Sequence, residues 1–214
     1  MTVGVVLGAG GPMGWAYHLG VTQGVRDAIG REPANADRVI GTSAGAAIAA
    51  ALLAGTPLDE VVEMISSPPS DEDRDQMRTA GADLRRRRLR ALRPVAPGLV
   101  RSVRHVGVAT ALVGLLPAGP FPTLMLRRFV STTAWPERLW VPSVRLDDGQ
   151  TVVFGRDHRP NTLGDALEAS SAVPGVFQPK TIDGARYVDG AVASSTHADA
   201  LVPEGLDVVL ISAP

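Results

Sequence analysis

The chain has 214 residues, of which 45% are hydrophobic and 20% are charged, and its formal net charge at pH 7 is −1. This length and composition predict one soluble globular domain with a sizeable core and exclude intrinsic disorder as the main state. The balanced charge disfavours nucleic-acid binding. The absence of cysteine excludes disulfides, cysteine-ligated metals and a cysteine nucleophile.

The first third of the chain alternates apolar strands with helices. Residues 3–7 and 38–40 are short apolar runs with β-branched side chains, which is typical of buried strands. Helices are expected over 15–29, 46–54 and 58–65. This strand–turn–helix order predicts an α/β fold with a parallel sheet and helical crossovers.

The composition changes after residue 66. Residues 67–118 contain a Ser/Pro-rich linker, an arginine run at 85–88 and an uncharged stretch, and we expect a cap inserted into a single domain that spans 1–214. Further elements are expected after the cap: a helix over 123–131, strands over 139–146 and 151–154, a helix from about 162 to 172, a hairpin over 180–188 and a last strand over 207–212.

Targeting and membrane signals are weak. The N-terminal sequence MTVGVVL has no basic region before an apolar stretch, so it predicts no signal peptide and a cytoplasmic protein. The uncharged stretches 39–58 and 106–126 are long enough to be tested as membrane spans, but the first is Ala/Gly-rich and the second contains three prolines. Buried or interfacial segments are therefore expected. The cap also offers a peripheral contact with an anionic membrane surface; a solvated helix beside a packed one is the alternative.

The sequence Gly41-Thr42-Ser43-Ala44-Gly45 lies between an expected strand and an expected helix. In such a Gly-x-Ser-x-Gly turn the glycines allow close backbone approach, and the serine oxygen sits at the positive end of the following helix. This context favours Ser43 as a nucleophile. The alternative is a serine that caps the helix in a tight turn.

A glycine-rich loop, Gly8–Gly14, connects the first strand to the first helix. Backbone N–H groups at such a turn can bind an anion. A dinucleotide-binding turn fits poorly, because Met13 stands where the third glycine is required. The other interpretation is an oxyanion hole made by the amides of Gly10 and Gly11, which would share a crevice with Ser43 if the two strands are neighbours.

A serine nucleophile needs a base, and both histidines and aspartates supply candidates. Among the four histidines, only His197 follows a plausible acid in the order of an α/β-hydrolase triad. His18, in the first helix, is expected on its surface or against the glycine loop, and a structural or solvated role is the simpler one for every histidine. Asp183 is explained by a hairpin turn. Asp189 ends the next expected strand, and burial there would raise its proton affinity above that of an aspartate in water, with a pKa of about 3.9. The alternative for Asp189 is a second Asp-Gly turn.

Together these motifs resemble the patatin-like phospholipase family. The family's glycine-rich loop, Gly-x-Ser-x-Gly turn and Asp-Gly-Gly/Ala motif are matched by residues 10–14, 41–45 and 189–191. Residues 169–179, ASSAVPGVFQP, are similar to the start of the family's third block. The resemblance extends over nearly the whole chain outside the cap. It implies a three-layer α/β sandwich with a mostly parallel central sheet.

The resemblance also implies a serine acyl hydrolase that cleaves carboxylic ester bonds of lipids through an acyl-enzyme intermediate, as phospholipase A, lysophospholipase or non-specific lipid acyl hydrolases do. Ser43 would be the nucleophile and Asp189 the proton acceptor in a dyad without histidine, beside an oxyanion hole at Gly10 and Gly11. The substrate would be a lipid or acyl ester, with no metal or other cofactor and no nucleic acid. The remaining motif positions support the geometry: Gly14, Gly41, Gly45 and Gly190.

The sequence departs from the family pattern at Met13, where an arginine or lysine is usual, and at Ala9, which replaces the first loop glycine. The chain also stops right after the strand at 207–212, where relatives commonly continue, so a truncated product is one expectation. Two other functions stay open. One is an α/β-hydrolase-type esterase with a Ser-His-acid triad that uses His197, and the other is a non-catalytic lipid-binding relative.

Overall fold

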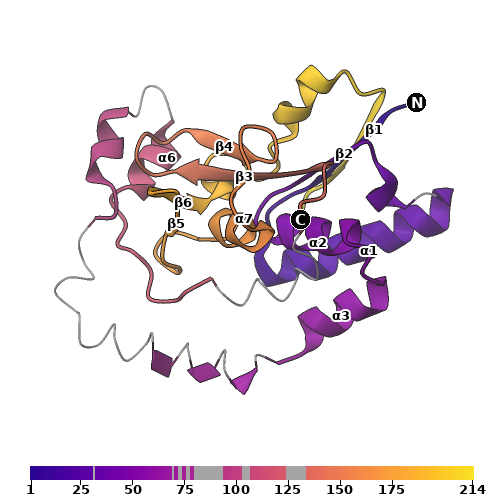
Figure 1. Ribbon diagram of the computed structural model, residues 1–214, viewed down its shortest axis with the longest axis horizontal. Helices are drawn as coiled ribbons and strands as arrows, with labels where there is room; N and C mark the ends of the chain where they lie inside the picture. Colours follow the sequence, from indigo (N-terminus) through magenta and orange to yellow (C-terminus); the bar gives the residue numbers. More distant parts are fainter. Residues whose placement is uncertain are drawn as a thin grey trace.

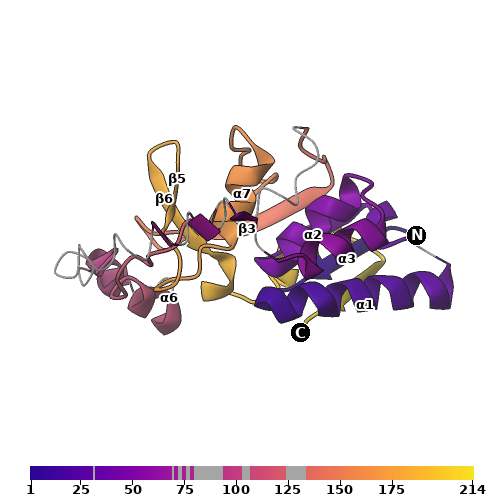
Figure 2. The same cartoon turned by 90° about the horizontal axis from the view of Figure 1, so that it is seen from below.

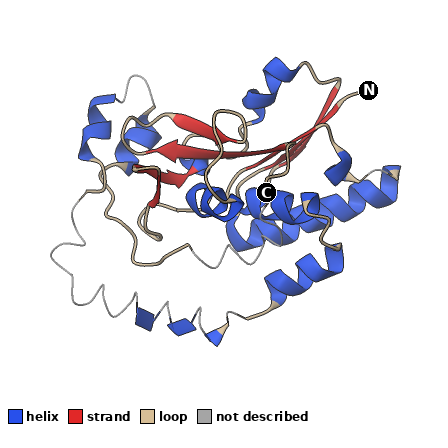
Figure 3. Ribbon diagram, viewed as in Figure 1, coloured by secondary structure: helices blue, strands red, loops and turns tan. Residues whose placement is uncertain are grey.

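A computed structural model of the chain describes residues 1–30, 32–68, 70–71, 74–75, 78–79, 94–102, 107–123 and 134–214. In this part of the chain a seven-stranded mixed sheet separates two layers of helices (Figures 1 and 3). Residues 124–131 of the helix expected over 123–131, and the arginine run at 85–88, lie outside the described residues. The predicted α/β class is confirmed.

The sheet has a parallel part and an antiparallel part, in the order β5-β6-β3-β2-β1-β7 with β4 paired to β3. Four strands run parallel: β1 (Val3–Leu7), β2 (Arg38–Gly41), β3 (Leu139–Arg145) and β7 (Val208–Ser212). Three strands form the antiparallel part around β3: β4 (Thr151–Phe154), β5 (Lys180–Ile182) and β6 (Ala185–Asp189). The hairpins predicted at the two Asp-Gly turns are confirmed.

Alternating side chains of the strands build a core on each face of the sheet. Val5 and Val141 face one set of helices, whereas Val6 and Trp140 face a short 3-10 helix on the other side. The first layer contains α1 (Gly11–Ile29), α2 (Ala44–Leu53), α3 (Leu58–Ser66) and α7 (Leu163–Ser170). The opposite layer contains η5 (Ala198–Glu204), η2 (Pro97–Ser102) and α6 (Val108–Val113), and the remaining short turns are η1 (Pro33–Asn35) and η4 (Gly190–Val192).

Two helices begin earlier than the sequence patterns predict. Helix α1 begins at Gly11 rather than at residue 15, because Pro12 suits the first helical turn, where its missing N–H costs nothing. Helix α2 begins at Ala44, directly after Ser43. Both glycine-containing loops therefore end at a helix N-terminus. The free backbone amides of these helices lie closer to the carboxyl ends of β1 and β2 than the sequence patterns predict.

The length of β3 positions the candidate site. Its first residues pair with β2 through Ile40 and Trp140, but β3 continues beyond the end of β2 and pairs there with β6. Because β6 runs antiparallel to β3, its last residue, Asp189, lies opposite Ser143 and points back toward the end of β2. Figure 2 shows α1 and α2 at one end of the molecule and α6 at the other, with this junction between them. None of the described helices is both long and apolar enough to span a bilayer.

Candidate active site

Ser43 occupies a strained turn between β2 and α2, with φ 54° and ψ −116°. A non-glycine residue in such a region costs roughly 1–3 kcal/mol and persists only where its surroundings hold it. Neither flanking position has room for a side chain. A Cβ on Gly45 would overlap the carbonyl oxygen of Leu7, and one on Gly41 would lie 2.6 Å from Ala46 Cα. The predicted nucleophile elbow therefore has the expected geometry.

The Ser43 hydroxyl donates a hydrogen bond of 2.7 Å to Oδ2 of Asp189. Both residues are buried, with 6% and 2% of their surfaces exposed. The other carboxylate oxygen, Oδ1, accepts a 2.8 Å hydrogen bond from the Ala191 amide, which fixes the carboxylate plane. The two residues predicted to form a dyad are thus in direct contact, although 146 positions separate them along the chain.

Burial raises the pKa of Asp189 to about 6, against the opposing effect of the hydrogen bonds from the Ala191 amide and the Ser43 hydroxyl. A carboxylate with a pKa near neutrality holds a proton more readily than one in water while remaining ionised at pH 7. Such a pKa suits a general base, because both the ionised form and the affinity for the transferred proton matter.

The glycine loop and the elbow both follow the carboxyl ends of neighbouring parallel strands, because Leu7 at the end of β1 pairs with Gly41 at the end of β2. A Cβ on Gly14 would contact Ala44 Cβ at 3.2 Å, so the first turns of α1 and α2 pack closely. Gly10 and Gly11 lie at the start of α1, where backbone N–H groups have no intrahelical acceptor. Their role as an oxyanion hole stays a prediction.

His197 is buried beside the elbow, but it contacts the neighbour of the nucleophile. Its Nδ1 lies 3.2 Å from Oγ1 of Thr42, and its buried Nε2 has no hydrogen-bond partner among the described residues. Burial lowers the pKa of His197 to about 4, so the ring is neutral at pH 7. The Ser43 hydroxyl bonds to Asp189, so the Ser-His-acid arrangement is not assembled here.

His18 is fully buried beneath the glycine loop, one of the two positions that the sequence suggested for it. Its Nε2 lies 2.7 Å from the Gly8 carbonyl oxygen, and its Nδ1 lies 2.7 Å from Oγ of Ser212. Since a carbonyl can only accept, Nε2 carries the proton and Nδ1 accepts from the Ser212 hydroxyl. Burial also lowers the pKa of His18. A neutral histidine therefore connects the loop to β7.

Ser170 contacts the elbow directly, although no pattern in its own neighbourhood predicts a role for it. The Ser43 amide donates to Ser170 Oγ at 3.0 Å, and this hydroxyl donates to the Pro142 carbonyl at 2.6 Å. Two residues later, the Ala172 carbonyl accepts from the Asp189 amide at 3.1 Å. The only signal in the sequence was the resemblance of residues 169–179 to a family block.

The described ranges contain no cluster of three or more His, Asp or Glu side chains placed to ligate a metal ion. The arrangement around Ser43 instead offers a hydroxyl, a carboxylate and main-chain amides, which are the groups needed for acyl transfer.

The chain matches one known protein family over most of its length. The family model for patatin-like phospholipases matches residues 5–202, a range that includes the glycine loop, the elbow and Asp189. The chain belongs to the patatin-like phospholipase family.

The curated relatives of this patatin-like chain are longer proteins. Rat patatin-like phospholipase domain-containing protein 2 is 29% identical over 188 residues, which cover 84% of this chain and 32% of that protein. Human omega-hydroxyceramide transacylase is 29% identical over 177 residues, covering 81% and 28%. The chain therefore spans about a third of the length of these relatives. Among solved structures, VipD from Legionella pneumophila has a TM-score of 0.49 and 15% identity, covering 90% of this chain and 46% of that one.

Proposed function

We propose that the protein is a serine acyl hydrolase that cleaves carboxylic ester bonds of lipids through a Ser43–Asp189 dyad. The observation that carries the proposal is the 2.7 Å hydrogen bond between the two side chains. Family membership supports the lipid ester as the substrate class. The strained backbone of Ser43 is further support, because such strain is concentrated at functional sites.

In the proposed reaction, Asp189 Oδ2 accepts the hydroxyl proton while Ser43 Oγ attacks the ester carbonyl carbon. The amides of Gly10 and Gly11 stabilise the oxyanion of the tetrahedral intermediate. Asp189 then returns the proton to the departing alcohol as the carbon–oxygen bond breaks, leaving an acyl group on Ser43. A water molecule, deprotonated by Asp189, hydrolyses this acyl-enzyme through a second tetrahedral intermediate and restores the serine.

Apolar side chains near the site support a contact with a lipid surface. Helix α6 packs against η4, which directly follows Asp189, through the contact of Thr110 Oγ1 with the Val192 carbonyl. Around this helix four large apolar side chains are exposed to solvent: Val108, Leu112, Leu115 and Leu116. We include a peripheral contact of this end of the molecule with a lipid surface in the proposed function, and co-sedimentation with phospholipid vesicles tests it.

A serine-reactive fluorophosphonate probe and a short-chain nitrophenyl ester test the dyad. The parent chain should be labelled and should turn over the ester, and Ser43→Ala should abolish both. Labelling that persists in Ser43→Ala would refute the nucleophile. Failure of the folded parent chain in both assays would favour a non-catalytic relative.

The base is tested by comparing Asp189→Asn with His197→Gln, each checked for folding by its thermal midpoint. The dyad predicts an inactive Asp189→Asn and an active His197→Gln. The opposite pattern would favour a triad that uses His197.

A further inference from the structure

Ser170, at the last residue of α7, contacts the nucleophile through the backbone rather than through the reacting atoms. Its hydroxyl is completely buried and has both hydrogen-bonding roles filled: it accepts from the Ser43 amide and donates to the Pro142 carbonyl of β3. We propose that Ser170 is a positioning residue that holds Ser43 in the backbone conformation required for attack. This inference rests on the proposed function.

The conformation of Ser43 explains why it needs such a contact. With φ 54°, the residue lies in the left-handed region, which L side chains rarely adopt, and it precedes the helix, so its N–H has no intrahelical acceptor. A buried N–H without a partner is destabilising. The Ser170 hydroxyl supplies that partner in the strained conformation, so the hydrogen bond stabilises this backbone geometry.

The same short segment also holds the base. Ala172 lies two residues beyond Ser170, and its carbonyl accepts from the Asp189 amide at 3.1 Å. The Pro142 carbonyl oxygen accepts a hydrogen bond from Ser170. The same oxygen would lie 2.6 Å from a Cβ on Gly190, so the residue after Asp189 packs closely against β3. Residues 170–172 therefore set the backbone positions of both members of the dyad relative to β3.

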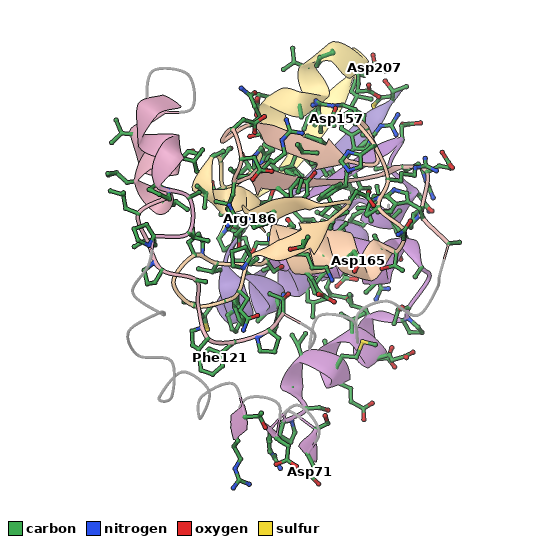
Figure 4. The ribbon with its side chains drawn as sticks, turned by 60° about the vertical axis from the view of Figure 1, so that its left-hand side comes forward. Asp71, Phe121, Asp157, Asp165, Arg186 and Asp207 are labelled. Carbon is green, nitrogen blue, oxygen red and sulfur yellow. The ribbon has the colours of Figure 1, made fainter. Side chains whose placement is uncertain are left out.

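Helix α7 is held by an N-terminal cap and by ion pairs to a neighbouring strand. Its first turn is capped by the Thr162 hydroxyl, which accepts from the Asp165 amide at 3.1 Å. Lys180 of β5 lies 2.7 Å from carboxylate oxygens of both Asp165 and Glu168. Figure 4 labels Asp165 on this helix. The buried hydroxyl at the end of α7 is therefore presented by a rigid element.

An isosteric pair of variants separates the hydroxyl from the shape of the side chain. Ser170→Thr and Ser170→Val introduce side chains of the same shape at a buried site, but only threonine keeps the hydroxyl. With the nitrophenyl ester, Ser170→Val should have a kcat about tenfold to a hundredfold below that of Ser170→Thr, because a displacement of about 1 Å can cost a factor of this size. The KM values should agree within about twofold, since Ser170 does not touch the substrate.

Thr162→Ala is the matched control, because it removes a hydroxyl that accepts an amide hydrogen bond at the opposite end of the same helix. It should lower the thermal midpoint while leaving kcat unchanged. Equal kcat values for the threonine and valine variants would overturn the proposal. So would a loss of kcat in Thr162→Ala as large as that in Ser170→Val, because activity would then follow the general stability of α7.

Hydrogen exchange at the Ser43 amide gives a measurement that does not depend on turnover. Exchange should be about tenfold faster in Ser170→Val than in Ser170→Thr, as expected for the loss of one buried hydrogen bond. If exchange accelerates but the parent chain neither reacts with the probe nor hydrolyses the ester, the proposed function fails and Ser170 is only structural. If exchange is unchanged, the positioning role is wrong even in an active enzyme.

Discussion

The parallel and antiparallel parts of the sheet contribute different kinds of groups to the candidate site. The parallel part ends in the glycine loop after β1 and the elbow after β2, where main-chain geometry and helix N-termini dominate. The antiparallel part contributes one side chain, Asp189, at the end of β6. We therefore expect substitutions at the loops of the parallel part to act mainly through backbone packing, and substitutions of Asp189 to act mainly through charge and proton affinity.

The largest expected effect is on the charge contributed by the antiparallel part. Asp189→Asn removes the proton acceptor while keeping the size of the side chain, so kcat for the nitrophenyl ester should fall by about 10²–10⁴-fold. Steady-state kinetics with the folded variant measure the loss. A kcat within tenfold of the parent would show that the carboxylate is not the base.

Added volume should break the parallel part. In Gly45→Ala the new Cβ would overlap the Leu7 carbonyl oxygen, a backbone atom that cannot move without disturbing β1. We expect a decrease in the free energy of unfolding of about 3 kcal/mol, at the upper end for overpacking, measured by urea denaturation. Gly20→Ala is the control, because nothing lies within 4 Å of its added Cβ in α1. Equal stabilities for the two variants would contradict the close-approach argument.

The raised pKa of Asp189 should also make stability depend on pH. Its pKa of about 6 in the folded state, against an ordinary value of 3.8, means that the folded protein binds this proton more tightly than the unfolded chain does. The stabilisation is complete below about pH 4 and is lost as the pH rises through about 6. The free energy of unfolding of Asp189→Asn, taken relative to that of the parent, should therefore be up to about 3 kcal/mol higher at pH 8 than at pH 4.

The two free energies of unfolding must be compared because two buried histidines change stability with pH in the opposite direction to Asp189. Burial lowers the pKa values of His18 and His197, so their contributions to stability are lost as the pH falls below about 6.5. Denaturation of both proteins across this pH range cancels these contributions. A constant difference between parent and Asp189→Asn would show that the carboxyl pKa is not raised.

The pH dependence of turnover sharpens the comparison between the two candidate bases. If Asp189 is the base, kcat/KM should fall by about tenfold for each pH unit below about 6, because only the ionised carboxylate accepts a proton. If His197 were the base, its pKa of about 4 would preserve activity to a lower pH. A pH–rate profile measured where the chain remains folded distinguishes the two.

The smallest expected effect is a gain in stability in α1. Gly20→Ala places a better helix former at a helix position with free space around the new Cβ, so the free energy of unfolding should rise by about 0.5–1 kcal/mol. Urea denaturation measures the gain, and kcat should not change. A loss of stability would indicate that this face of α1 needs the glycine.

Most elements and the serine elbow could be predicted because their signals are local, whereas Asp189 was implied as the base only by the resemblance to a family. The Gly41–Gly45 turn predicts a serine elbow because the glycines leave no Cβ to obstruct close backbone contacts. The start of α1 was misplaced because the glycine loop does not resemble a helix, although Pro12 is compatible with a first turn. The role of Ser170 could not be predicted, since its partners Ser43 and Pro142 are distant in the sequence.

The chemical groups of the candidate site follow directly from the sequence: a serine in a glycine turn, a loop of exposed amides and an aspartate at a strand end. That Asp189 rather than His197 receives the Ser43 hydrogen bond follows only from the folded arrangement of the strands. The physical reason is that β3 extends past β2 and pairs with β6, so two strand ends meet at one point. Burial at that point then raises the proton affinity of the carboxylate and lowers that of the imidazole.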